Sequence, residues 1–198
     1  PALPITWGQR VSTWIQVVGE ARNAVAAAVP MPVSCAGPVG SGIEMEGATA
    51  ADLARAWAGR LALTTTATSW HTTRFPVLRT ASALGEACAA FGKLAGDVLD
   101  GVRAGELREP GDGQGRSTAM AFKRNPVLSV QMRRSALAAP PLVGLLFAAA
   151  GMAATERPDG AWHAEWPALR GLARHAIGAC ELAQRLAAGL VLDVETAA

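Results

Sequence analysis

The sequence contains no tyrosine, few aromatic residues of any kind and no strong excess of charge of either sign. Aromatic residues make up 5% of the 198 residues, charged residues make up 17%, and the formal net charge is +2. No basic run indicates a nucleic-acid surface, and no acidic tail indicates a solvating arm. Hydrophobic residues nevertheless account for 51% of the chain. That share is too high for a disordered protein, so we expect a sizeable core.

Cysteine is scarce as well. Cys35, Cys88 and Cys180 lie far apart and show no C-x-x-C or C-x-x-H spacing. An odd, scattered set argues against a disulfide framework and for a reducing, cytoplasmic location. Because the cysteines lack the spacing of metal ligands, the sequence also argues against a metal site. We expect Cys88 and Cys180 to be buried thiols on apolar helical faces.

A long membrane-spanning run and a secretion signal are missing from the sequence. The longest apolar stretch, residues 140–154, is rich in alanine and interrupted by glycine. It is shorter than the roughly 20 residues that span a membrane, so it predicts a buried helix. Nothing near residue 1 resembles a signal peptide.

Helical spacing of apolar residues recurs along the chain, whereas the alternation typical of strands does not persist anywhere. The predicted helices cover about 5–29, a short segment from about 49, 76–102, a segment from about 126, and 167–190. Thr49 and Asp52 have capping-box spacing, and Pro140 and Pro141 predict a kink or break in the fourth helix. The pattern indicates an all-α fold, a bundle of long helices. The broadly apolar helices further indicate packing on other subunits.

Some side chains have two interpretations at this stage. The tryptophans at 7, 14 and 57 fit core stripes, whereas Trp162 and Trp166 line either a pocket or a subunit interface. His71 is either an anion contact or a structural histidine, and His163 and His175 are expected to be structural.

Polar chemistry is concentrated in residues 113–129. This segment opens with a glycine-rich stretch that we interpret as a loop, followed by Ser117, Thr118, Lys123 and Asn125, and then by a predicted helix N-terminus. A lysine charge, asparagine donors and free helix N–H groups together suit a carboxylate or phosphate ligand. A serine beside such a cluster ionises more easily. On composition alone, a solvated loop before an ordinary helix start fits the same residues.

The same segment resembles a known signature. Residues 116–126 read Arg-Ser-Thr-Ala-Met-Ala-Phe-Lys-Arg-Asn-Pro, and the fumarase/aspartase superfamily signature is Gly-Ser-Ser-x-Met-Pro-x-Lys-x-Asn-Pro. The serine, methionine, lysine, asparagine and proline agree in register. Arg116 and Ala121 depart from the signature glycine and proline. Arginine restricts the loop at a position where glycine alone takes positive φ freely.

Two further segments resemble the 3-carboxy-cis,cis-muconate cycloisomerase branch of that superfamily, and a third resembles a turn found in relatives. Residues 70–74 read Trp-His-Thr-Thr-Arg, close to the Trp-His-Thr-Gln-Arg-Asp of the branch, with Phe75 in place of the aspartate. Residues 156–169 match a longer Glu-Arg-x-x-Gly-x-Trp-x-x-Glu-Trp-x-x-Leu pattern. Residues 37–41, Gly-Pro-Val-Gly-Ser, are similar to a turn that lines the substrate site in relatives. The resemblance therefore extends over nearly the whole chain.

The resemblance implies cycloisomerisation of 3-carboxy-cis,cis-muconate in protocatechuate breakdown, without a metal or an organic cofactor. Ser117 is implied to be the general base. The residues implied to hold substrate carboxylates are Thr118, Lys123, Asn125, Arg74, Arg157 and Ser41. For Arg157, an ion pair with Glu156 or Glu165 is an equal alternative. The family also implies a cytoplasmic homotetramer whose active sites combine residues from three subunits.

Residues 1–198 are expected to form the central helical-bundle domain, without the N-terminal and C-terminal domains of the family. The chain is then a fragment, an isolated domain or a degenerate gene product, weakly active or inactive by itself. Two other functions stay open. One is a different superfamily lyase, of the adenylosuccinate or argininosuccinate type. The other is a non-catalytic helical assembly remnant.

Overall fold

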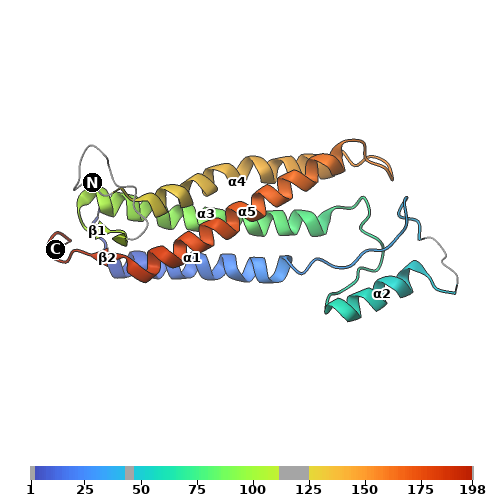
Figure 1. The fold of residues 1–198 in the computed structure, drawn as a ribbon, viewed down its shortest axis with the longest axis horizontal. Helices are drawn as coiled ribbons and strands as arrows, with labels where there is room; N and C mark the ends of the chain where they lie inside the picture. Colours follow the sequence, from blue (N-terminus) through green and yellow to red (C-terminus); the bar gives the residue numbers. More distant parts are fainter. Residues whose placement is uncertain (1–2, 43–46, 112–124, 198) are drawn as a thin grey trace. The chain divides into compact units, whose positions relative to one another are not determined.

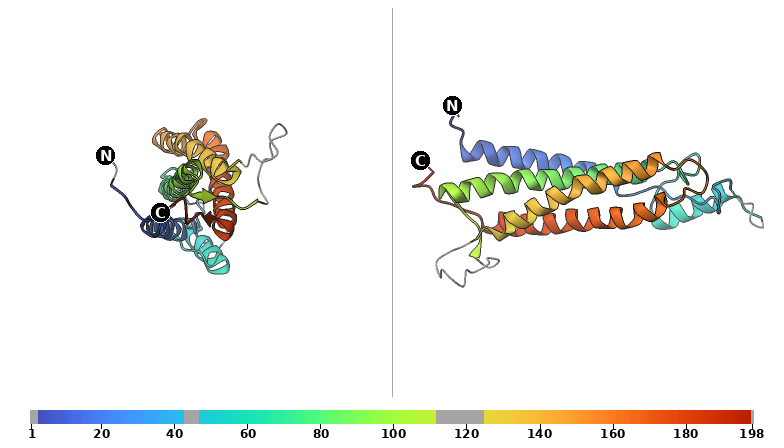
Figure 2. Two further views of the ribbon diagram at one scale, coloured as in Figure 1. Left: turned by 90° about the vertical axis from the view of Figure 1, so that its left-hand side faces the viewer. Right: turned by 90° about the horizontal axis from the view of Figure 1, so that it is seen from above.

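The computed structural model describes residues 3–42, 47–111 and 125–197 (Figure 1). The elements are α1 (Trp7–Ala28), α2 (Ala50–Leu61), α3 (Phe75–Ala104), β1 (Leu107–Arg108), α4 (Val127–Gly151), α5 (Ala161–Gly189) and β2 (Val191–Leu192). Figure 2 gives two further views of these helices. The predicted all-α class is confirmed, since the described part contains four long helices, one shorter helix and a single pair of two-residue strands.

The chain divides into two compact units. Unit 1 comprises residues 1–22, 85–140 and 173–198, and unit 2 comprises residues 23–84 and 141–172. Helices α1, α3, α4 and α5 each contribute one part to either unit, and α2 belongs to unit 2.

Small residues bring helices close together in unit 1. A Cβ added at Gly92 of α3 would lie 2.4 Å from the Cβ of Ala136 in α4. In the same unit, Val98, Met132 and Leu186 supply fully buried side chains from α3, α4 and α5. Trp14 secures α1 by donating its indole N–H to Asp97 of α3 at 2.7 Å. The predicted burial of Trp14 is thus confirmed, and its indole nitrogen has the partner that a buried tryptophan needs.

A short antiparallel pair joins the chain after α3 to the chain after α5. Leu107 pairs with Leu192, and Arg108 pairs with Val191. Two-residue strands are too short to show an alternating pattern, so apolar periodicity could not predict them.

In unit 2, α2 begins with the predicted capping box. Thr49 Oγ1 accepts the N–H of Asp52, and the Asp52 carboxylate accepts the N–H of Thr49 at 3.0 Å. Hydrogen bonds from Thr49 are the main reason that the pKa of Asp52 is lowered. The expected core role of Trp57 is wrong, because 45% of this residue is exposed and α2 buries Ala54 and Ala58 instead.

Two predictions about prolines differ from the structure. The break predicted as one outcome at Pro140 and Pro141 is absent, because helix α4 continues through both residues. The predicted start of the last helix at Pro167 is wrong, because α5 begins at Ala161 and Pro167 lies inside it. Gly160, at φ +71°, supplies the positive-φ position that ends the preceding turn.

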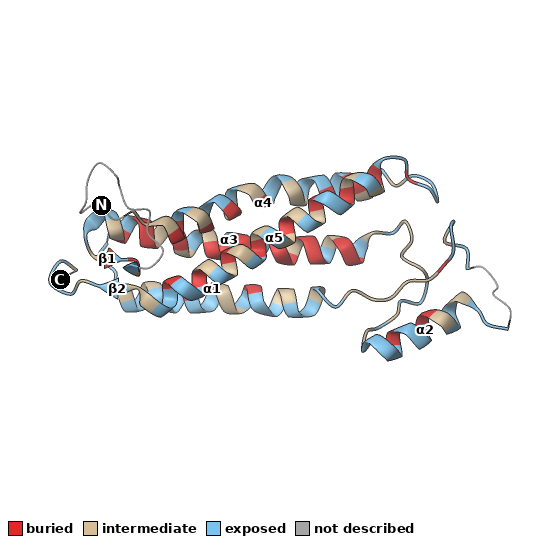
Figure 3. Cartoon of the chain, viewed as in Figure 1, coloured by how far each residue is buried: buried red, intermediate tan, exposed pale blue. Residues whose placement is uncertain are grey.

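Helix α4 is less buried than its composition predicts. By length and hydropathy it is the one helix in the described ranges that could cross a membrane, yet only 22% of its most apolar window is buried within the chain. Figure 3 shows buried and exposed positions alternating along it. Leu128, Met132 and Leu146 are buried, whereas Leu137 is 73% exposed. The prediction of a buried helix therefore holds for one face only.

Candidate functional site

The predicted site residues lie in different parts of the chain. Ser117, Thr118 and Lys123 lie outside the described residues. Asn125 belongs to unit 1, and Ser41, Arg74 and Arg157 belong to unit 2. The described candidates therefore divide between a helix start in unit 1 and a group of loops and helix ends in unit 2.

At the helix start in unit 1, a carboxylate of the chain itself occupies the N-terminus of α4. The Glu109 carboxylate accepts the N–H of Leu128 at 3.0 Å and the N–H of Ser129 at 2.9 Å. Glu109 is only 6% exposed. The sequence prediction that this helix end offers free N–H groups to a ligand is therefore wrong for these two amides. Nothing in the sequence pattern signalled the contact, because Glu109 lies 19 positions before Leu128 and no short-range pattern relates the two residues.

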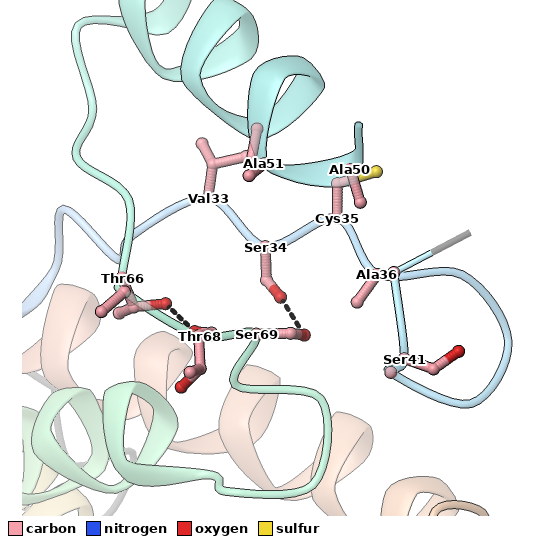
Figure 4. A pocket seen from close by; sticks show the side chains of 14 residues that line it. Val33, Ser34, Cys35, Ala36, Ser41, Ala50, Ala51, Thr66, Thr68 and Ser69 are labelled. Atoms are coloured by element: carbon pink, nitrogen blue, oxygen red, sulfur yellow. Dashed lines mark hydrogen bonds between the residues drawn. The ribbon is translucent and has the colours of Figure 1, made fainter. Parts of the chain in front are cut away.

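Ser41 lines an open pocket of about 270 Å³ in unit 2 (Figure 4). The walls are the chain around Ser34 and Ser41, the first turns of α2, and residues 66–69. Figure 4 shows the Ser34 and Ser69 hydroxyls turned toward each other, 2.8 Å apart and hydrogen-bonded. Among the described lining residues, the polar side chains are hydroxyls and one thiol, and none is charged. This wall can exchange hydrogen bonds with a polar group but supplies no neutralising cation.

His71 holds the turn that carries Ser41. A Cβ at Gly40 would lie 2.9 Å from the Cβ of His71, and Gly40 has φ +74°, so this position requires glycine on two counts. A ring nitrogen of His71, Nε2, is 2.9 Å from the carbonyl oxygen of Glu156. Its ring meets that of Trp162 edge to face, with centroids 4.9 Å apart. The sequence left His71 as either an anion contact or a structural histidine, and these contacts within the chain favour the structural role.

Arg74 is engaged by a carboxylate of the same unit. Its Nε and Nη2 donate to the two oxygens of Glu165 at 2.9 and 2.6 Å, a bidentate pair. The side chains are 13% and 5% exposed. The guanidinium also lies over the Trp70 ring, 4.8 Å from its centroid, and Nη1 donates to the His71 carbonyl. The Nε and Nη2 donors of Arg74, which would bind a substrate carboxylate in the same bidentate way, are therefore already engaged by Glu165.

Among the predicted residues that the structure describes, Arg157 is an exposed cation. Its backbone N–H donates to the Thr155 hydroxyl, and across the described ranges its side chain forms no ion pair. The alternative of a pair with Glu165 is not realised, because that carboxylate binds Arg74. The side chain of Arg157 is therefore available to an anion from solution.

Neither of the other two histidines nor Cys88 has reactive surroundings, and the prediction that Cys180 is buried is wrong, because this thiol is only partly buried. Nδ1 of His175 lies 3.4 Å from the Ser135 hydroxyl, and the His163 ring meets that of Trp166 edge to face. Cys88 is fully buried, and burial raises its pKa to about 11, so the thiol stays protonated near neutral pH. Within the described ranges, no group of three or more His, Cys, Asp or Glu side chains lies close enough together to hold a metal ion.

No family model matches the chain. A nitrosuccinate lyase from Streptomyces davaonensis is 38% identical over 205 residues, which take in 98% of this chain and 43% of that protein. A 3-carboxy-cis,cis-muconate cycloisomerase from Pseudomonas aeruginosa is 35% identical over 198 residues, with the same coverage of both chains. The chain thus spans less than half the length of these relatives.

Solved structures agree with the sequence comparison. The 3-carboxy-cis,cis-muconate lactonizing enzyme from Pseudomonas putida superposes with a TM-score of 0.86 at 31% identity, covering 99% of this chain and 43% of that one. A fumarate lyase from Mesorhizobium sp. BNC1 gives 0.76 at 25% identity, covering 98% of this chain and 43% of that one. A class II fumarase from Schistosoma mansoni gives 0.71 at 16% identity, covering 98% of this chain and 46% of that one, a likeness of fold alone.

Proposed function

Because the chain belongs to the fumarase/aspartase superfamily and corresponds to its central helical domain, we propose that it carries catalytic residues of a lyase or cycloisomerase for a small polycarboxylate. The observation that carries the proposal is the alignment of 98% of the chain with two enzymes of this type. Residues 116–126 supply the catalytic signature within it. We also propose that both units belong to one domain, since four helices contribute to each.

In the proposed reaction, one base and several carboxylate-binding groups suffice. In the lactonising direction, a substrate carboxylate oxygen bonds to one alkene carbon, and the neighbouring carbon gains a proton. In the eliminating direction, Ser117 removes that proton beside a carboxylate, and the carbon–oxygen bond breaks. Lys123, Asn125 and Thr118 hold substrate carboxylates, because cationic and donor groups stabilise the negative charge that develops during proton removal. No metal or organic cofactor is required by this chemistry.

The unit 2 residues are assigned different parts in this proposal. Ser41 offers a hydroxyl from the pocket wall. Arg157, exposed and without an ion-pair partner in the described ranges, supplies a cation to a further carboxylate. Arg74 already holds Glu165, so its contacts favour a supporting role over direct binding.

A second substrate is favoured by one observation. The nitrosuccinate lyase is more similar to this chain than the cycloisomerase from Pseudomonas aeruginosa is, at 38% against 35% identity. In this alternative, Ser117 removes a proton from the carbon beside a carboxylate of nitrosuccinate. Nitrite leaves from the adjacent carbon, and fumarate forms. The base and the carboxylate-binding groups keep the same roles, and only the leaving group differs.

A substrate panel tests the proposal on the purified whole protein that contains this chain. We expect turnover of 3-carboxy-cis,cis-muconate, followed by loss of its ultraviolet absorbance. Release of nitrite from nitrosuccinate, with no muconate turnover, would instead select the second substrate. Turnover of adenylosuccinate or argininosuccinate alone would refute both. Absence of every activity would favour a helical assembly remnant. Residues 1–198 alone are expected to be weakly active or inactive.

We propose that the protein is a cytoplasmic homo-oligomer, a tetramer by resemblance to its family. Large apolar side chains are exposed on several helices, among them Leu137 at 73%, Ile177 at 59% and Trp166 at 55%. A membrane is a poorer partner for α4, because Arg133 and Arg134 are adjacent within the helix and charges at bilayer depth are costly. A second copy covers such faces at no comparable cost.

The oligomer is tested by replacing Leu137 with glutamate, which places a charge on an exposed apolar face. We expect the native mass, measured by light scattering, to fall from that of an assembly to that of a smaller species. Arg185→Glu, at an exposed and already polar position of α5, serves as the control and should leave the mass unchanged. A monomeric wild-type protein would contradict the proposal.

A further inference from the structure

Glu109 is a buried carboxylate that the proposed reaction does not use. It follows β1 directly, and β1 is paired with β2. The next residue, Pro110, packs against the end of α5, where a Cβ added at Gly189 would lie 2.6 Å from the Pro110 Cβ. The backbone on both sides of Glu109 is therefore held by the end of α5 and by β2. Its side chain accepts hydrogen bonds from the first turn of α4, so the position of that turn depends on the position of Glu109.

The two bonds made by this carboxylate join positions far apart in the sequence. Glu109 and Ser129 are 20 positions apart, and the catalytic signature lies between them. The first N–H groups of a helix have no partner inside the helix, and a buried N–H left without an acceptor is costly. The carboxylate removes this cost for Leu128 and Ser129, and its charge matches the positive end of the helix dipole. It thereby determines where α4 begins.

The start of α4 in turn determines the position of a proposed substrate-binding residue. Asn125 is separated from the helix by Pro126 alone, and its carbonyl oxygen accepts the N–H of Val127 at 2.8 Å. A shift of the first turn would move the Asn125 backbone with it. Since the Glu109 carboxylate already takes the N–H groups of Leu128 and Ser129, a substrate carboxylate is left to side-chain donors.

We propose that Glu109 is a positioning residue. By fixing the first turn of α4, it places Asn125 where that residue can bind a substrate carboxylate. This inference rests on the proposed function, in which Asn125 binds a substrate carboxylate. Glu109 touches no reacting atom in this assignment. Its effect is therefore expected in substrate affinity more than in the chemical step.

The test compares Glu109→Gln and Glu109→Asp with Glu181→Gln, a matched control at an exposed glutamate of α5 in the same unit. In the whole protein, we expect Glu109→Gln to raise KM by about tenfold, the equivalent of one lost interaction of about 1.4 kcal/mol, while kcat changes less. The dissociation constant of tricarballylate, an unreactive tricarboxylate probe, should rise by a similar factor. Glu109→Asp keeps the charge on a shorter side chain and should raise KM and the dissociation constant by a smaller factor. It provides the test if Glu109→Gln does not fold.

Amide exchange at Leu128 and Ser129 gives a readout that needs no substrate. We expect it to be faster in Glu109→Gln than in the wild type and unchanged in Glu181→Gln. A variant that loses only thermal stability, with KM, tricarballylate binding and amide exchange at wild-type values, would overturn the inference and leave the proposed function intact. A wild-type protein that turns over no panel substrate and binds no tricarballylate would overturn the proposed function, and the positioning assignment with it.

Discussion

Replacing Ser117 with alanine in the whole protein is expected to lower kcat by about 10³-fold, within the range that a positioned general base contributes. The change removes one oxygen atom and adds no bulk, so the fold should be retained. The measurement is kcat and KM on the substrate that the panel identifies, alongside a thermal unfolding curve. A small change in KM is expected, because the base acts on the proton and the carboxylates are held by other groups.

Two control variants sharpen this prediction. Ser12→Ala removes a serine hydroxyl from an exposed position of α1, where it donates to the Gly8 carbonyl, and should leave both constants unchanged. Thr118→Val removes the neighbouring hydroxyl and should raise KM more than it lowers kcat, as expected for a carboxylate-binding group. If Ser117→Ala keeps its activity while Thr118→Val loses kcat, the base has been assigned to the wrong hydroxyl.

The sequence predicted the helices well because their signals are local. Apolar spacing located α1 and α3 to within two residues at each end, and the Thr49–Asp52 capping box identified the start of α2. Predictions about burial were weaker. Trp57 shares a helical stripe with other apolar residues, yet α2 turns its alanines inward. Periodicity identifies an apolar face without identifying what covers it, and part of such a face is exposed in a single chain.

The candidate site could be predicted as a set of residue types but not as a set of contacts. The sequence marked the α4 N-terminus and Arg74 as receptors for anions. In the structure both hold carboxylates of the chain, Glu109 at the helix end and Glu165 on Arg74. Glu165 is 91 positions from Arg74, and no short-range pattern relates the two residues. A motif therefore indicated groups that bind carboxylates, while the identity of the carboxylate in the structure depended on long-range packing.

The Arg74–Glu165 pair leads to the largest expected change in stability. Replacing Arg74 with methionine leaves the Glu165 carboxylate, only 5% exposed, without its cation. Removing one partner of a buried ion pair costs about 3–5 kcal/mol, because the remaining charge stays desolvated. We expect a fall of that size in the free energy of unfolding, measured by urea denaturation followed by circular dichroism.

The matched control is Arg103→Met, which breaks an exposed pair with Asp100 whose side chains are 65% and 71% exposed. Exposed pairs contribute about 0–1 kcal/mol, so this variant should unfold nearly like the wild type. The double variant Arg74→Met/Glu165→Leu removes both buried charges and should recover most of the lost stability, as apolar replacement of buried ion pairs does elsewhere. The same double variant separates the two roles of Arg74. If KM is close to the wild-type value in the restabilised protein, Arg74 serves the fold, whereas a KM raised at least tenfold would show that it binds a substrate carboxylate directly.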